Sequence, residues 1–419
     1  MEKLIRRFHG LQLKNNMSLF GINQILGKNI AFSALSRFAS QIVAILSNFI
    51  LARALGVSGF GEYAFVSAIV LIGNAVTTFG TDMVLIRKIS AEKDYSGLSN
   101  SLVLQLIISF ILIFCVFIFS SSQTLRLYIF SLIPLSFFTI STIALRGSHN
   151  INLFSILHFA FSFFQFISAC LVYLLDEKIS QLVLLLLLAH VLSAFVGVLF
   201  CFSKIPNFII FQKPSREKII DLMQISFPLA IIGSLRLIYE RLSLTVFPFL
   251  TNLFYAGLFS ASMRVLDAIK LGYISALTPI YPEMSRDKNF LSLQTGLRLL
   301  LLSSIFLSLT IFLLARYLIV FLFGTEFESA TISLQIMAWI LPFYVVVSYY
   351  SLGFLAIELE KPVLLSLSAS LFGLMTMLIV LTQAYGLVGG AVAVLSAEML
   401  QASLLFIQWR KYAVSKLSK

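Results

Sequence analysis

Charged residues are scarce in this chain of 419 residues, because Asp, Glu, Lys and Arg together make up only 11% of it. A soluble domain is about a quarter charged and about half apolar. Here 59% of the residues are hydrophobic, so too little polar side-chain surface is present to cover a water-soluble globule of this size. The composition therefore excludes a soluble protein and predicts a polytopic membrane protein.

Cysteine and nucleotide-binding motifs are also scarce or missing. The three cysteines, Cys115, Cys170 and Cys201, lie far apart inside apolar runs, without a C-x-x-C pair or a nearby histidine cluster. This spacing predicts neither a disulfide framework nor a metal site. No G-x-x-x-x-G-K-[ST] motif occurs, so the sequence does not predict ATP hydrolysis by a P-loop mechanism. We expect no cofactor, no metal and no catalytic residues, and coupling to H+ or Na+ stays open.

Apolar stretches are abundant and predict an all-α fold of about twelve transmembrane helices. A spanning helix needs ~20 mainly apolar residues. Strands of a membrane barrel alternate polar and apolar residues, whereas residues 182–188 are an unbroken apolar run. The expected spans are 29–52, 60–86, 98–120, 125–145, 152–174, 180–202, 222–248, 254–280, 296–315, 331–356, 363–383 and 387–409.

Basic residues predict the orientation of these spans. Cytoplasmic loops carry an excess of Lys and Arg, and the outer segments hold only Arg53, Arg126, Lys178 and Arg316. Most other basic residues, within the net charge of +12, fall in the alternate loops and at both ends of the chain. Both termini are therefore expected in the cytoplasm, and the inner-loop bases are expected to contact anionic lipids.

The domain organisation follows from the basic loop at 203–218, which divides the chain into two sets of six spans. We expect an N-terminal six-helix bundle at 29–202 and a C-terminal one at 219–410. A faint repeat, 59–65 against 254–260, supports a duplicated transporter. Residues 1–28 predict a basic amphipathic segment on the membrane surface, and 411–419 form a basic tail.

A small group of charges lies inside the predicted spans, where each ionised side chain costs ~2.5 kcal/mol or more unless it faces water or a partner. Five bases against two acids leave a charge of +3, which favours an anion. Arginine matches phosphate oxygens with a planar pair of donors. The predicted anion-binding residues are Arg37, Arg236, Arg241, Arg264 and Lys270, and the acids are Glu240 and Asp267.

The alternative is that these charges only pair and hold helices together. Arg236 and Glu240 are four residues apart and share a helix face. Spacing also allows a pair between Arg264 and Asp267. The bases then left without a partner are Arg37, Arg241 and Lys270.

Three further charges are candidates for smaller roles. Glu398 lies alone in the last span, where it either carries a coupling proton or hydrogen-bonds to a neighbouring helix. Arg53 and Glu62 lie at the outer ends of the first two spans. They either pair at a mouth or extend toward the membrane surface.

Three short motifs resemble those of bacterial polysaccharide and O-antigen flippases. LGVSGFGEYA at 55–64 looks like the loop between their first two spans, and GTDMVLIRKIS at 80–90 is similar to the end of the second. YGLVGGA at 385–391, after Lys361 and Pro362, resembles the segment that joins their last two spans. That family belongs to the multidrug, oligosaccharidyl-lipid and polysaccharide exporter superfamily.

The resemblance implies two six-helix bundles around a V-shaped central cavity with alternating access. It implies a bacterial inner-membrane flippase in lipopolysaccharide or capsule biosynthesis. Its substrate would be a polyprenyl-pyrophosphate-linked oligosaccharide, moved from the cytoplasmic to the periplasmic leaflet. A polysaccharide polymerase and the chain-length machinery are implied partners, and nucleic acid is not.

Two other functions stay open. A cation-coupled multidrug exporter of the same superfamily would need an acidic cavity, which the excess of basic residues disfavours. A membrane-embedded glycosyltransferase or polymerase would present catalytic groups in a sizeable outer loop, and no predicted outer loop offers the room. We therefore expect a transporter and not an enzyme.

Overall fold

The computed structural model describes residues 2–176, 178–205, 208, 213–277 and 291–417. All regular secondary structure in these ranges is helical, which confirms the expected all-helical polytopic membrane protein. The helices are α1 (Glu2–Thr78), α2 (Thr81–Glu92), α3 (Gly97–Phe119), α4 (Gln123–Tyr128), η1 (Ile129–Ser131), α5 (Leu132–Gly147), α6 (Ile151–Leu175), α7 (Ile179–Lys204), α8 (Arg216–Leu250), α9 (Leu253–Leu277), α11 (Leu291–Phe323), η2 (Thr325–Ala330), α12 (Thr331–Ala338), α13 (Ile340–Ala356) and α14 (Glu360–Leu417).

The two longest helices each contain a sharp kink at a glycine. Gly56 in α1 has φ 65° and ψ −177°, and Gly386 in α14 has φ 56° and ψ −127°. Residues with a Cβ atom rarely adopt such backbone angles, so glycine is required at both corners. Each of these helices therefore consists of two helical arms joined by one residue, where the sequence predicted a short loop between spans.

Within the described residues, eight helices are long and apolar enough to cross a membrane, or nine if the bent pair α12–α13 forms one span. This number is below the expected twelve for physical reasons. The helices α1 and α14, which have two arms each, are each counted as one helix. Helix α9 is not counted among the eight, because it carries three charged residues, Arg264, Asp267 and Lys270.

Two predicted spans differ from the structure, one in its end and one in being bent. The span expected at 60–86 ends at Thr78, because Phe79 (φ 50°) and Gly80 (φ 64°) interrupt the helix before the separate helix α2 begins at Thr81. The span expected at 331–356 is bent by 42° between α12 and α13. The expected linker at 203–218 lies partly outside the described residues. So do the side chains of residues 1–31 and 413–419, and with them the predicted amphipathic face of 1–28 and most of the tail.

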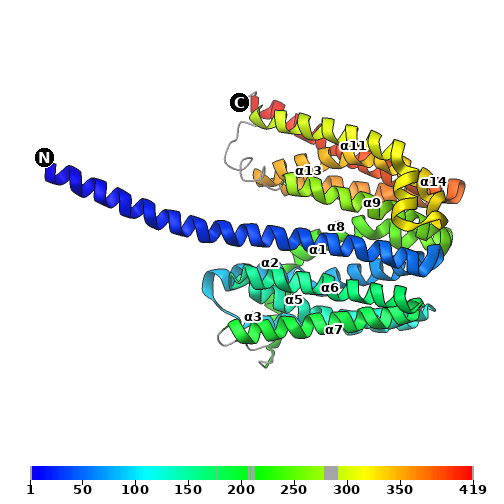
Figure 1. Ribbon diagram of the computed structural model, residues 1–419, viewed down its shortest axis with the longest axis horizontal. Helices are drawn as coiled ribbons and strands as arrows, with labels where there is room; N and C mark the ends of the chain where they lie inside the picture. The colour runs from blue at the N-terminus through cyan, green and yellow to red at the C-terminus, as the bar shows by residue number, and fades with distance from the viewer. Residues whose placement is uncertain (1, 177, 206–207, 209–212, 278–290, 418–419) are drawn as a thin grey trace.

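The helices form two groups in Figure 1. Helices α2–α7 make up one group and α9–α14 the other, with α1 and α8 running between them. Helix α1 packs against both α6 and α9, and α8 packs against both α1 and α14. The start of α1 and the end of α14 lie at one end of the molecule, and α1 turns back at the opposite end (Figure 1).

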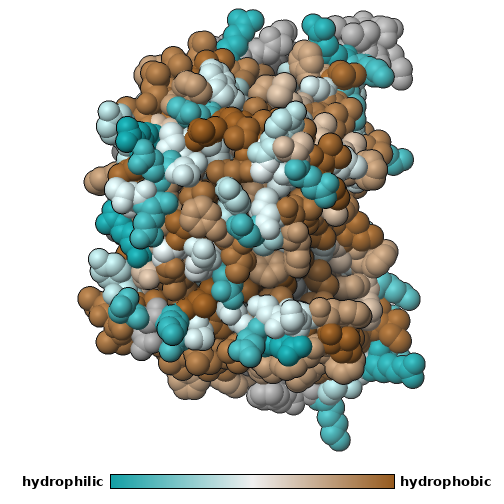
Figure 2. Space-filling model, turned by 90° about the vertical axis from the view of Figure 1, so that its right-hand side faces the viewer, coloured by the Kyte–Doolittle hydropathy of each residue, from teal (hydrophilic) through white to brown (hydrophobic). Residues whose placement is uncertain are grey.

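The molecular surface is largely apolar, as expected for contact with lipid. Large hydrophobic side chains such as Phe114, Phe119, Phe306, Phe321 and Phe372 are exposed. In Figure 2, brown hydrophobic residues dominate the view and hydrophilic residues form separate patches. A soluble monomer rarely exposes so large an apolar area, so the surface supports a membrane environment.

The two groups of helices meet in a tightly packed seam, which we define as the contact of residues 57–66 of α1 with residues 253–263 of α9. A Cβ atom at Gly61 would overlap the carbonyl oxygen of Leu253, and one at Gly257 would overlap that of Val57. The two segments of the faint sequence repeat therefore touch through their backbones. Close approach of this kind is typical of small residues between membrane helices.

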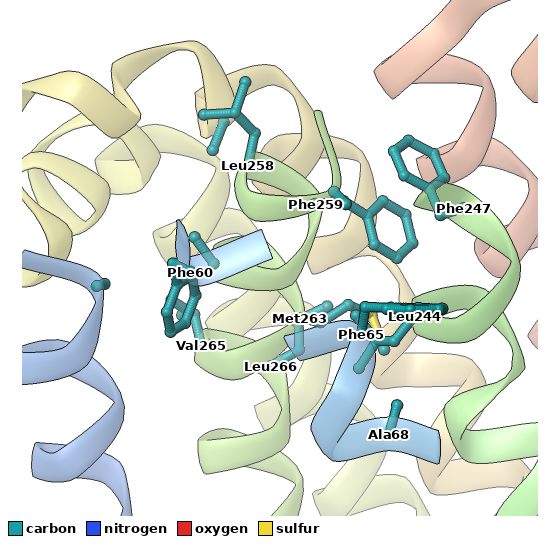
Figure 3. Close-up of a cluster of buried hydrophobic side chains, with 14 of the residues drawn as sticks. Phe60, Phe65, Ala68, Leu244, Phe247, Leu258, Phe259, Met263, Val265 and Leu266 are labelled. Atoms are coloured by element: carbon teal, nitrogen blue, oxygen red, sulfur yellow. The ribbon is translucent and has the colours of Figure 1, made fainter. Parts of the chain in front are cut away.

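Aromatic rings pack around the seam, toward η2 on one side and toward α8 on the other. Phe60 is fully buried, and its ring centroid lies 5.9 Å from that of Phe327. Phe247 of α8 stacks on Phe259 of α9 with centroids 4.5 Å apart. Figure 3 shows Phe247 of α8 beside Phe259 of α9, and Phe60 of α1 in the same region of contact. All four of these side chains are buried, so they extend the close packing between the two groups of helices.

Candidate functional site

Helix α8 ends at Leu250 and α9 begins at Leu253, so a short connection joins them. The two helices therefore run back along each other, and their charged residues lie near one another. On α8, Arg236 donates from Nε to Glu240 Oε1 at 3.3 Å, which confirms the pair expected from their spacing. Both side chains are exposed. Charges in the middle of a membrane helix need water or a partner, so this face of α8 is expected to border an aqueous space.

The second ion pair links the two helices. Arg241 Nη1 lies 3.4 Å from Asp267 Oδ2, so the acid of α9 pairs with α8. The expected pair of Asp267 with Arg264 is therefore wrong. Spacing compares positions on one helix, whereas the side chain of Asp267 extends to the facing helix, which the sequence does not locate.

The third ion pair is the most buried one of the cluster. Lys270 Nζ of α9 lies 3.8 Å from Glu398 Oε1 of α14. The Lys270 ammonium also lies 5.0 Å from the ring centroid of Tyr344 on α13, a distance at which a cation and an aromatic face attract each other. Lys270, expected to lack a partner, thus has two. Glu398 has the partner on a neighbouring helix that one interpretation of the sequence expected.

Arg264 is the basic residue left without an acid. Among the described side chains it forms no ion pair, and its Nε atom is buried without a hydrogen-bond partner. Its electrostatic neighbours are Tyr63 and Tyr128 from the N-terminal half, with Arg241 and Asp267. Arg264 therefore brings an uncompensated positive charge to the boundary between the two halves.

The charge balance of the cluster differs from the expected one. The described bases are four and the acids three, because Glu398 joins the cluster, so one positive charge is in excess. Arg37 lies in α1, and its side chain is outside the described residues. The sign of the excess agrees with the sequence, and its magnitude is smaller.

The two candidates for a mouth do not meet. Arg53 donates from Nη2 to the carbonyl oxygen of Phe321 on α11. No ion pair joins Arg53 to Glu62 in the part of the chain described by the structure. Arg53 therefore connects α1 with the C-terminal group of helices.

Sequence reasoning missed the tyrosines that surround the charges. Tyr63 and Tyr128 lie beside Arg264, and Tyr239 and Tyr344 lie beside Glu398. Their only signal in the sequence is a phenol within an apolar span, and that signal is common to many membrane helices. Their clustering required the tertiary structure.

The fold and the charged cluster together define a class. The chain has the fold of the MOP superfamily, and it resembles the lipid II flippase MurJ in an inward closed conformation with a TM-score of 0.77. The match has 17% sequence identity and covers 91% of this chain and 87% of the flippase. An inward-facing multidrug resistance transporter of the MATE family matches with a TM-score of 0.69, at 17% identity over 90% of this chain and 95% of that one.

A third structure with this fold is a MOP superfamily transporter from Pyrococcus furiosus, whose binding pocket is described as having reverse polarity. It matches with a TM-score of 0.62 and 16% identity over 94% of this chain and 96% of that one. The three solved structures are those of a flippase and two transporters, so the fold is one expected for a transporter.

The particular family follows from the sequence match. Residues 26–287 match the family of polysaccharide biosynthesis proteins, and the chain belongs to this family. No curated protein matches it. The expected link to polysaccharide biosynthesis is therefore confirmed, and the fold is the one expected for the superfamily.

Proposed function

We propose that the protein is a flippase that moves a polyprenyl-pyrophosphate-linked oligosaccharide across the bacterial inner membrane. The substrate is an O-antigen or capsule repeat unit, and it moves from the cytoplasmic to the periplasmic leaflet. The family of polysaccharide biosynthesis proteins and a fold shared with a lipid II flippase support this class of substrate.

The observation that carries the proposal is the uncompensated charge of Arg264. An arginine without an acidic partner is costly inside a membrane protein unless it contacts water or an anion. Arg264 lies near the middle of α9, between tyrosines of one half and charged residues of the other. A pyrophosphate supplies oxygen acceptors that fit the guanidinium donors. Arg241 and Lys270 provide two further cations close by, on α8 and α9.

The proposed topology has twelve spans. Eight helices are long and apolar enough to span the membrane. Counting α1 and α14 as two spans each, and adding the charged helix α9 and the bent pair α12–α13, gives twelve. Residues 29–202 and 219–410 form two bundles that rock against each other, and the termini are cytoplasmic. The seam through Gly61 and Gly257 then closes the periplasmic side, at the end opposite the termini.

A cation-coupled multidrug exporter is the second candidate, because a MATE family transporter shares the fold. The described charges favour anions over organic cations, since the bases exceed the acids. An organic cation would meet Arg264 without an acid to compensate for it. The flippase is therefore the better-supported function.

Reconstitution tests the proposal directly. The full chain is incorporated into liposomes that contain a fluorescent polyprenyl-pyrophosphate oligosaccharide, and a membrane-impermeant quencher reports the fraction in the outer leaflet. We expect exchange between leaflets only in liposomes with protein, inhibited by added polyprenyl pyrophosphate. If the probe remains in its leaflet while a fluorescent organic cation crosses, the protein is an exporter. Polymer formed from the probe would instead identify an enzyme.

A further inference from the structure

Glu398 is a buried acid, and one of its carboxylate oxygens has no hydrogen-bond partner. Its side chain is 8% exposed, and Oε1 faces the Lys270 ammonium at 3.8 Å. The second oxygen, Oε2, is buried and has no hydrogen-bond partner. A buried carboxylate is stable in the ionised form only while a cation or several donors compensate for it. Lys270 is the one cation that contacts it in the described part of the chain.

The elements packed against this part of α14 bring few other titratable groups near Glu398. Helix α8 brings Tyr239 and Glu240 into electrostatic range of Glu398. Helix α9 brings Lys270, and α13 brings Tyr344, whose ring lies against the Lys270 ammonium. Helix α12 carries no titratable residue. Glu240 adds negative charge, so the Glu398 carboxylate depends on Lys270 alone for a compensating charge.

The other two acids of the cluster differ from Glu398 in their access to water. The side chains of Glu240 and Asp267 are 45% and 34% exposed. Water can therefore solvate them if an anion draws Arg236 or Arg241 away. Glu398 has no such solvation, so the loss of Lys270 leaves it with a buried, unpaired charge.

We propose that Glu398 and Lys270 form a proton-exchange site, in which binding of an anionic phosphate group at Lys270 is linked to uptake of one proton by Glu398. The inference rests on the proposed function, because it takes the substrate head group as the anion. Lys270 keeps its three protons and turns from Glu398 to a phosphate oxygen. A proton from water forms an O–H bond at Glu398 Oε2, which leaves a neutral acid. Release of the anion reverses both changes.

This linkage has a measurable size. If Glu398 is ionised in the free protein and protonated in the complex, the affinity for the phosphate group falls about tenfold for each unit of pH rise, beyond the titration of the ligand itself. One proton per bound ligand also enters from the buffer. Neither effect is expected where the acid keeps its charge throughout.

The test uses the purified full chain in lipid nanodiscs, with polyprenyl pyrophosphate as the probe. Calorimetry in buffers of different ionisation enthalpy gives the number of protons taken up. We expect Glu398→Gln to bind the probe with about one proton fewer than the wild type. Glu360→Gln, an exposed acid at the start of the same helix, is the matched control and keeps the wild-type uptake.

Two further measurements distinguish loss of the proton-exchange site from misfolding of the Glu398→Gln variant. Lys270→Gln removes the cation, so Glu398 is already protonated before binding, and the uptake disappears together with part of the affinity. Infrared difference spectra of the wild type should show a protonated carboxyl band on binding that Glu398→Gln lacks. Equal proton uptake in wild type and Glu398→Gln would overturn this site alone. Absence of probe binding to the wild type would overturn the proposed function as well.

Discussion

Arg264 and its neighbours show how single residues acquire different roles within one cluster. Arg241 and Lys270 each have an acid within ion-pair distance, so their charge is compensated before any ligand binds. Arg264 has two tyrosines, Arg241 and an acid beyond ion-pair distance around it. An incoming anion therefore gains an interaction with Arg264 without first breaking an ion pair, whereas binding at Arg241 or Lys270 displaces an acid.

Replacing Arg264 by Gln should therefore weaken substrate binding more than replacing any surface base. Loss of hydrogen bonds to a charged group costs about 1.5–3 kcal/mol, which corresponds to about 10–100-fold in affinity. Binding of polyprenyl pyrophosphate to the purified protein measures the effect. Arg298→Gln, at an exposed position of α11, is the control and should bind like the wild type. Equal affinity of both variants would remove Arg264 from the site.

At the scale of elements, the kink at Gly56 lets one continuous helix cross the membrane and return. Its φ of 65° with ψ near 180° belongs to a region that residues with a Cβ avoid. The same corner lies against η2, since a Cβ at Gly56 would contact the carboxylate of Glu326 at 3.4 Å. The corner therefore requires glycine mainly for its backbone angles, and only secondarily for space.

Substitution of Gly56 by Ala should lower the stability of the protein by about 1–3 kcal/mol, the usual cost of a strained backbone. The measurement is the thermal unfolding midpoint of the detergent-solubilised chain. Gly233→Ala is the matched control, because Gly233 lies inside α8 and a Cβ there meets nothing within 4 Å. Alanine favours a helix over glycine, so the control should be unchanged or slightly more stable. An equal decrease in both variants would contradict the strain argument.

The seam between α1 and α9 depends on a second kind of glycine, one that provides space. A leucine at Gly257 would overlap the backbone of Val57 and push the two helices apart. Spin labels at Lys178 and Glu326 report the separation of the two halves at this end of the molecule. We expect Gly257→Leu to shift their distance distribution to longer values. Gly272→Leu, on the same helix but with nothing within 4 Å, should leave it unchanged.

At the scale of the whole molecule, the alternation of connections between two ends gives a topology that labelling can test. Lys178 and Glu358 are both exposed residues in connections, the first before α7 and the second before α14. The proposed orientation places Lys178 in the periplasm and Glu358 in the cytoplasm. In a chain whose three cysteines are replaced by Ser, Lys178→Cys should react with an impermeant maleimide in intact spheroplasts. Glu358→Cys should react only after lysis, and the reverse pattern would invert the topology.

The sequence predicted the class of protein because that information is local. Too few charges to cover a soluble surface and long apolar runs identify membrane helices without any knowledge of their partners. The same local logic identified Arg236 with Glu240, which share one helix face. It failed at the end of the second span and at the bend after α12, where single residues break a helix inside an otherwise apolar run.

What only the tertiary structure decided is which charges meet. Asp267 pairs with Arg241 and not with Arg264, and Glu398 pairs with Lys270 although more than a hundred residues separate them in the chain. Ion pairs across helices depend on how the helices cross, and a hydrophobic pattern carries no record of that crossing. By itself, the sequence determined that this is a helical membrane protein with an excess of positive charge within its spans. The packing of α8, α9 and α14 decided that the excess rests on Arg264, because it gave Arg241 and Lys270 an acid each.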